Sequence, residues 1–119
     1  MANPGPSTTV TASYFNTMSN SQKALIFSAA LAPVSVAANT TAEQIFALTA
    51  GTGVVVSDFV TVNKPAAQAG LGVVNVRAAG VDSIAITYAN NTASPIVPTT
   101  ETYLVKAEKV TAVTPAFPY

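Results

Sequence analysis

The chain has 119 residues, half of them hydrophobic and 8% charged, and its five basic and five acidic side chains give a formal net charge of zero. So few dispersed cations cannot neutralise a row of phosphates, and no apolar run approaches the roughly 20 residues that cross a bilayer, so we expect neither nucleic acid nor membrane as a partner. Cysteine, histidine and tryptophan are absent, which excludes disulfides, Cys/His zinc sites and histidine general bases.

Residues 1–32 have the composition of an extended N-terminal arm. Pro4 and Pro6 stand beside glycine and serine, a combination that favours an extended chain. The stretch Ser19–Leu31 then places polar residues before an apolar run that Pro33 closes. Its apolar residues fit one face of a helix and the alternation of a strand equally well, so the local form of this segment stays open.

Four side chains of this arm are candidate partner-binding residues, namely Tyr14, Phe15, Leu25 and Phe27. Aromatic anchors are favoured at interfaces, but they are equally ordinary in cores. Tyr14 and Phe15 therefore either pack back on their own domain or attach the arm to a neighbouring subunit. The sequence does not separate these two arrangements.

From residue 33 to residue 113 the pattern is that of short β-strands bounded by turn formers, among them Gly51-Thr-Gly and Asn90-Asn. Segments rich in β-branched and aromatic residues recur about every ten residues, which predicts an all-β domain. We expect a single β-sandwich, jelly-roll or Ig-like, of about seven to eight strands. The strand-forming segments are Val34–Ala37, Gln44–Thr49, Val54–Val56, Phe59–Asn63, Val73–Arg77, Ser83–Tyr88 and Thr102–Ala107.

Alternation within two of these segments predicts which side chains face the core. Successive strand residues point to opposite faces, so Ile84, Ile86 and Tyr88 share the expected core side of Ser83–Asn90. In the last strand, Tyr103, Val105 and Ala107 lie opposite Lys106 and Glu108. The two charged residues most simply mark a solvated face, and only secondarily a contact patch.

The last residues, 114–119, form a C-terminal tail in this interpretation. Pro115 and Pro118 flank two further candidate partner-binding residues, Phe117 and Tyr119. The tail either docks these aromatic side chains in a groove or frays, as chain ends commonly do.

Nothing in the sequence predicts catalysis, a cofactor or a metal site. Gly51-Thr-Gly and Gly70-Leu-Gly lack the third glycine, the Lys-Ser/Thr pair and the following helix of nucleotide-binding loops, and we interpret them as turns. No hydroxyl residue has the histidine or Ser-x-x-Lys partner that would activate it. The carboxylates are scattered singly, so a hydrolase that relies on carboxylates alone ranks far below a non-enzymatic protein.

The segments Asp58–Pro65, Gln68–Ala78, Asp82–Thr92 and Pro98–Val105 together carry a resemblance to a known family. They resemble a β-domain that recurs in small structural proteins of tailed bacteriophages. The similarity covers roughly Pro33 to Lys109, so the N-terminal arm falls outside it. In that family the domain is a sandwich displayed on the particle, as a capsid decoration (cement) protein or as part of a fibre or spike.

The resemblance implies a non-enzymatic virion structural protein, made in the host bacterial cytoplasm and placed on the capsid surface. Its expected partner is the major capsid protein, and the family favours a homo-oligomer, specifically a trimer. The alternative is a receptor- or carbohydrate-binding module of a phage fibre or tail. Because the matching positions are turn glycines, strand apolar residues and strand-end polar residues, no catalytic, cofactor or metal residue is carried over.

Overall fold

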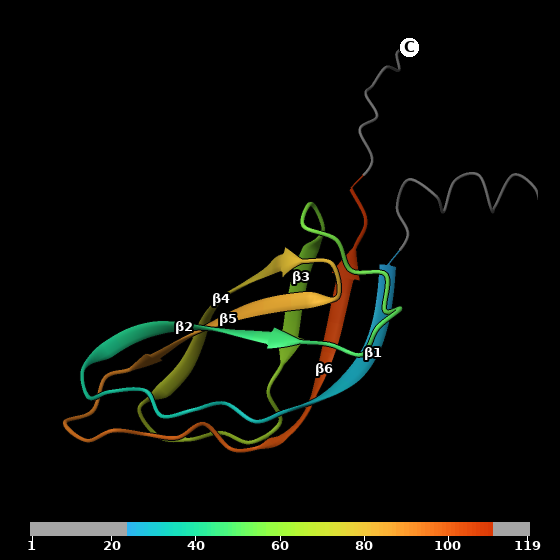
Figure 1. Ribbon diagram of the computed structural model, residues 1–119. Coiled ribbons are helices and arrows are strands. Elements are labelled where there is room, and N and C mark those ends of the chain that lie inside the picture. The colour runs from blue at the N-terminus through green and yellow to red at the C-terminus, as the bar shows by residue number, and fades with distance from the viewer. Residues whose placement is uncertain (1–23, 111–119) are drawn as a thin grey trace, which may run out of the picture.

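The computed structural model describes residues 24–110. In this range the chain is all-β, without helix, and forms two antiparallel sheets of three strands each (Figure 1). One sheet has the order β1-β6-β3 and the other β2-β5-β4. The strands are β1 (Ala24–Leu31), β2 (Thr40–Ala47), β3 (Phe59–Asn63), β4 (Leu71–Gly80), β5 (Ser83–Asn90) and β6 (Glu101–Glu108).

The described residues contain six strands, so the prediction of seven to eight strands is wrong. Two predicted segments, Val34–Ala37 and Val54–Val56, are not strands. Val36 forms only an isolated bridge with Ile96, yet the side chains of Val36 and Val54 are fully buried. Each segment thus contributes one core residue from a loop, and burying one side chain requires no ladder of backbone hydrogen bonds.

The expected domain boundary at Pro33 lies too late in the chain. β1 pairs with β6 over all eight of its residues, from Ala24↔Glu108 to Leu31↔Glu101. Of the two local forms that the sequence left open, the strand is therefore the one observed. Strand alternation places Leu25 and Phe27 on the core side, where they pack against buried residues. The folded domain consequently includes residues that we assigned to the arm.

The inner faces of both sheets contribute to one hydrophobic core. As predicted, Ile84, Ile86 and Tyr88 of β5 are fully buried, and so are Tyr103, Val105 and Ala107 of β6. The remaining core residues are Leu31, Val36, Val54, Val60 and Ala78. Lys106 and Glu108 are exposed on the other side of β6, as expected for a solvated face.

Ala85 is also fully buried, although alternation predicts that it faces outward. It lies on the central strand β5, opposite Ile45 of β2 on one side and Arg77 of β4 on the other. Arg77 reaches over β5 to Glu43, and the Nε–Oε2 distance is 2.7 Å. A small side chain flanked by these longer ones loses its exposure, so burial here follows from its neighbours.

A buried hydrogen bond connects the two sheets. The hydroxyl oxygens of Tyr88 and Tyr103 are 2.7 Å apart, and neither residue is exposed. Burial is the main cause that raises the pKa of both phenols, because an apolar environment disfavours the charged phenolate. The stability that these neutral phenols contribute is fully present below pH 10, the ordinary tyrosine value, and is lost as the pH rises above it.

We therefore expect Tyr88 and Tyr103 to resist ionisation until the protein unfolds. The measurement is the phenolate absorbance during an alkaline titration of the variant Tyr14→Phe/Tyr119→Phe, which retains only these two of the four tyrosines. Absorbance should rise only together with the loss of β structure, followed by circular dichroism. A reversible ionisation near pH 10 in the folded protein would contradict the buried position of both rings.

Candidate partner-binding site

The structure places two of the six predicted partner-binding residues, Leu25 and Phe27. Both lie on β1 and are partly buried against the core. The other four, Tyr14, Phe15, Phe117 and Tyr119, lie outside the described residues.

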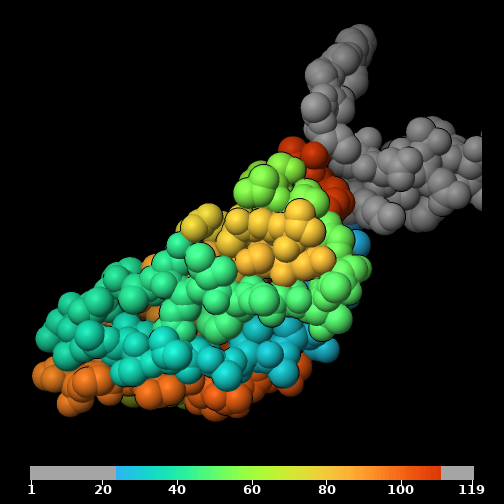
Figure 2. All heavy atoms as spheres, in the orientation of Figure 1, coloured from blue at the N-terminus to red at the C-terminus, as the bar shows by residue number. Residues whose placement is uncertain are grey.

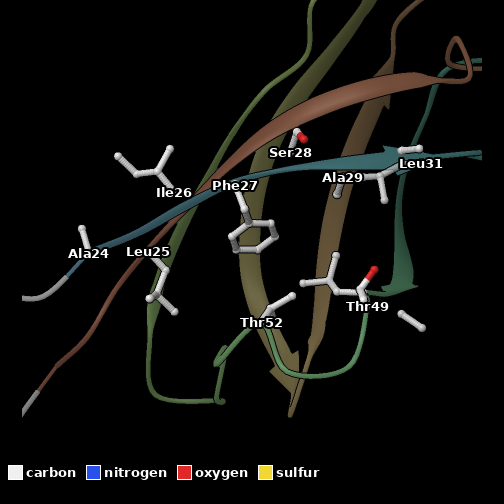
Figure 3. A pocket seen from close by; sticks show the side chains of 12 residues that line it. Ala24, Leu25, Ile26, Phe27, Ser28, Ala29, Leu31, Thr49 and Thr52 are labelled. Atoms are coloured by element: carbon white, nitrogen blue, oxygen red, sulfur yellow. The ribbon is translucent and has the colours of Figure 1, made fainter.

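Leu25 and Phe27 line a groove that runs along the whole of β1. Its opposite wall is formed by the end of β2 and the loop that follows, through Ala47, Leu48, Thr49 and Thr52, and its volume is about 540 Å³. Leu25 and Phe27 project toward the side where Thr52 lies, whereas Ile26 and Ser28 project away from it (Figure 3). In the space-filling view, β1 is visible at the surface between that loop and β6 (Figure 2).

Within residues 24–110, the outer edge of β1 carries none of the features that usually block a sheet edge, unlike the other three edges. Exposed edges are usually blocked by charges, prolines, bulges or short length, because their free N–H and C=O groups can pair with another chain. β1 has eight residues without a charge, a proline or a register shift. By contrast, β3 has five residues and is followed by Lys64-Pro65, β4 contains two register shifts, and β2 carries Glu43.

The loop across the groove is held firmly by the turn between β4 and β5. The carboxylate of Asp82 accepts hydrogen bonds from the Thr52 hydroxyl at 2.6 Å and from the backbone N–H groups of Gly51 and Gly53. These bonds hold the pKa of Asp82 below its ordinary value, the Thr52 hydroxyl being the largest cause. Gly51 and Gly53 both have φ of 91°, a conformation that favours glycine, so the predicted turn is confirmed.

A second exposed feature is the outer face of the sheet β1-β6-β3, which we call the outer face. It displays Ile26, Leu104 and Phe59, which are 71%, 52% and 68% exposed. Ile26 lies opposite Lys106 across the β1–β6 pair, and Phe59 lies opposite Glu108 across the β3–β6 pair. Three apolar side chains therefore surround a charged pair. We did not identify them from sequence, although alternation with Tyr103 and Val105 places Leu104 outward.

The charged residues of the described range satisfy one another. Four ion pairs join Lys64–Glu101 at 3.0 Å, Arg77–Glu43 at 2.7 Å, Lys106–Glu108 at 3.9 Å and Lys109–Asp58 at 2.8 Å. The hydrogen bond from Arg77 lowers the pKa of Glu43, and the same bond raises the pKa of Arg77. Of the charged residues between 24 and 110, only Asp82 is outside these pairs, and its carboxylate accepts the hydrogen bonds from the loop. Each basic side chain among residues 24–110 therefore has an acidic partner.

A cluster of metal ligands and a membrane-spanning helix are both absent from the part of the chain that the structure describes. Between residues 24 and 110, no three acidic side chains come together in a way that could hold a metal ion. The same residues contain no helix with the length and apolarity needed to span a membrane. Comparison of the whole chain with family models, with curated proteins and with solved structures gave no match.

Proposed function

We propose that this protein is a non-enzymatic virion structural protein, namely a capsid decoration protein. In this proposal its two sheets act as a rigid β-sandwich that binds the outer surface of a phage head. It stabilises contacts between copies of the major capsid protein and uses no cofactor, nucleic acid or membrane. The proposal depends on the resemblance of residues 33–109 to the structural β-domains of tailed bacteriophages.

The observation that supports this function best is the outer face, with Ile26, Leu104 and Phe59 exposed from three adjacent strands. Burying one large apolar side chain contributes about 1.5 to 3 kcal/mol before the cost of association. Lys106 and Glu108 add polar groups to the apolar ones, a mixture that is ordinary at non-obligate interfaces. A decoration protein repeats such a contact over the shell, so a modest affinity at each site suffices.

We also propose that the protein forms a homo-oligomer, and the resemblance favours a trimer. Mutual pairing of the charged side chains leaves little free charge on the described surface. A net charge of zero also gives weak protection against self-association. Sedimentation of the purified protein at micromolar concentration measures this state directly.

The test of the proposal is a matched pair of substitutions, Ile26→Ser and Ile45→Ser. Both isoleucines are exposed, at 71% and 63%, but Ile26 is on the outer face and Ile45 is on the other sheet. We expect Ile26→Ser to weaken binding to shells assembled from the major capsid protein of the same genome by about tenfold or more. Ile45→Ser should bind like the unmodified protein.

Binding is measured by co-sedimentation of the purified protein with those shells. If the unmodified protein does not bind the shells, the decoration function is wrong. If it binds and both variants bind equally well, the outer face is not the contact surface.

A further inference from the structure

We infer that the groove beside β1 is an acceptor site for one extended strand, and that its occupant is residues 9–16 of the same chain. This segment lies outside the described residues. In the inferred arrangement it pairs antiparallel with the free edge of β1 and adds a fourth strand to the sheet β1-β6-β3. The inference concerns the fold and is independent of the proposed capsid partner.

The two sheets are open along one flank and closed along the other. On the closed flank, β3 lies close to β4. On the open flank, the groove separates β1 from the end of β2 and the loop after it. Within residues 24–110, β1 pairs with β6 alone. An uncharged, regular edge of eight residues beside a groove is the arrangement that accepts an added strand.

The sequence just before β1 has the pattern that such a strand needs. Val10, Ala12 and Tyr14 alternate with Thr9, Thr11, Ser13 and Phe15. A strand with this alternation presents one apolar side and one largely polar side. Like β1, the segment carries no charge, no proline and no glycine. The segment therefore has the alternation and the composition of a half-buried strand of this fold.

The connection to β1 predicts the register. A hairpin with Ser19-Asn20 as its two central residues pairs Tyr14 with Leu25, Ala12 with Phe27 and Val10 with Ala29. Asparagine is among the residues that such turns favour. In this register the apolar side of the segment coincides with the core side of β1, and Ala12 and Ala29 each stand opposite a larger side chain. A shift by one residue would turn the polar side inward.

This register gives the two aromatic residues of the arm different positions. Tyr14 faces the groove and packs on its own domain. Phe15 faces outward opposite Ala24, next to Ile26 on the outer face. A capsid-binding role for Phe15 depends on the proposed function, whereas the position of Tyr14 does not.

The same chain is favoured over a second copy because the segment is tethered close to its site. A short connection gives an effective concentration in the millimolar range, far above that of another molecule at micromolar concentration. The groove also favours a lone strand over a second folded copy, because the loop wall at Ala47–Thr52 stands beside the edge.

Paired cysteines test both the register and the origin of the strand. The variant Thr11→Cys/Ser28→Cys places two thiols opposite each other on the outer side, where Ser28 is exposed. The hairpin makes this a non-hydrogen-bonded pair, whose short Cβ separation suits a disulfide. The matched control is Ala12→Cys/Ser28→Cys, whose thiols lie on opposite faces. The chain has no other cysteine, so each thiol has one possible partner within the chain.

After mild oxidation we expect the first variant to form an intramolecular disulfide in most of the molecules, and the control in about tenfold fewer. Non-reducing electrophoresis and intact mass distinguish a monomer closed by its own disulfide from linked copies. Linked copies in the first variant would mean that the strand comes from another molecule. Equal linkage in both variants, or none in either, would mean that the segment does not pair with β1 in this register. Either result overturns the inference.

Discussion

Replacing Asn90 with aspartate is expected to lower the free energy of unfolding at pH 7 by about 3 kcal/mol or more. Asn90 is 2% exposed. Its Nδ2 donates to the carbonyl oxygens of Val36, Ala37 and Ser94 at 3.1, 3.2 and 2.8 Å. A carboxylate would direct a negative oxygen at these three acceptors and would supply no donor. The three hydrogen bonds of Asn90 would then be lost, and of the contacts across this region only backbone bonds such as those between Val36 and Ile96 would remain.

Urea denaturation at pH 7 measures this loss, with Asn91→Asp as the matched control. Asn91 is exposed, and an exposed substitution of this kind should change stability by no more than about 0.5 kcal/mol. The pH dependence has a defined sign. Because the folded protein disfavours the ionised form of the introduced carboxyl, the deficit of Asn90→Asp should shrink as the pH is lowered toward 4. A deficit below about 1 kcal/mol at pH 7 would contradict the buried hydrogen bonds.

The pair Tyr88 and Tyr103 should show strong coupling between the two sheets. Tyr88→Phe or Tyr103→Phe alone leaves one buried hydroxyl without its partner at 2.7 Å, which should cost about 1 to 3 kcal/mol. The double variant removes both hydroxyls together. Its cost should therefore be well below the sum of the two single costs.

A double-mutant cycle by urea denaturation measures this coupling, because the stability effects of substitutions at residues in direct contact deviate from additivity while those at independent residues do not. The matched control is Tyr88→Phe combined with Thr61→Val, a position on the exposed side of β3. The effects of those two substitutions on the free energy of unfolding should be additive. Additive costs for the two tyrosines would mean that their hydroxyl groups are not partners.

The sequence predicted strands best where alternation is strong and the strand lies between neighbours. β6 follows period two, and so does β5 apart from Ala85; Ile86 and Val105 are buried as that period requires. β1 was ambiguous because its run is short and fits a helix as well. Only its pairing with β6, at the other end of the chain, determines its form.

The candidate site was harder to predict, because it depends on contacts between distant segments. Leu25 and Phe27 were identified as apolar residues near the start of the chain. Their position in a groove depends on the loop at Ala47–Thr52, and that loop depends in turn on hydrogen bonds from Asp82. No local sequence pattern indicates contacts that depend on one another across such distant segments. The exposure of Phe59 was likewise not predicted, since an aromatic residue in a strand usually suggests burial.

The pairing of the first described strand with the last has a consequence for biosynthesis. β6 lies at the centre of its sheet, between β1 and β3, so this sheet cannot form until the C-terminal part of the chain has left the ribosome. Of the strand pairs in the structure, only β4 and β5 are neighbours in sequence joined by a tight turn. Pairings over long sequence separations fold slowly. The apolar strand β1 is therefore synthesised long before β6 can pair with it, and chains in such an incompletely folded state are prone to aggregate.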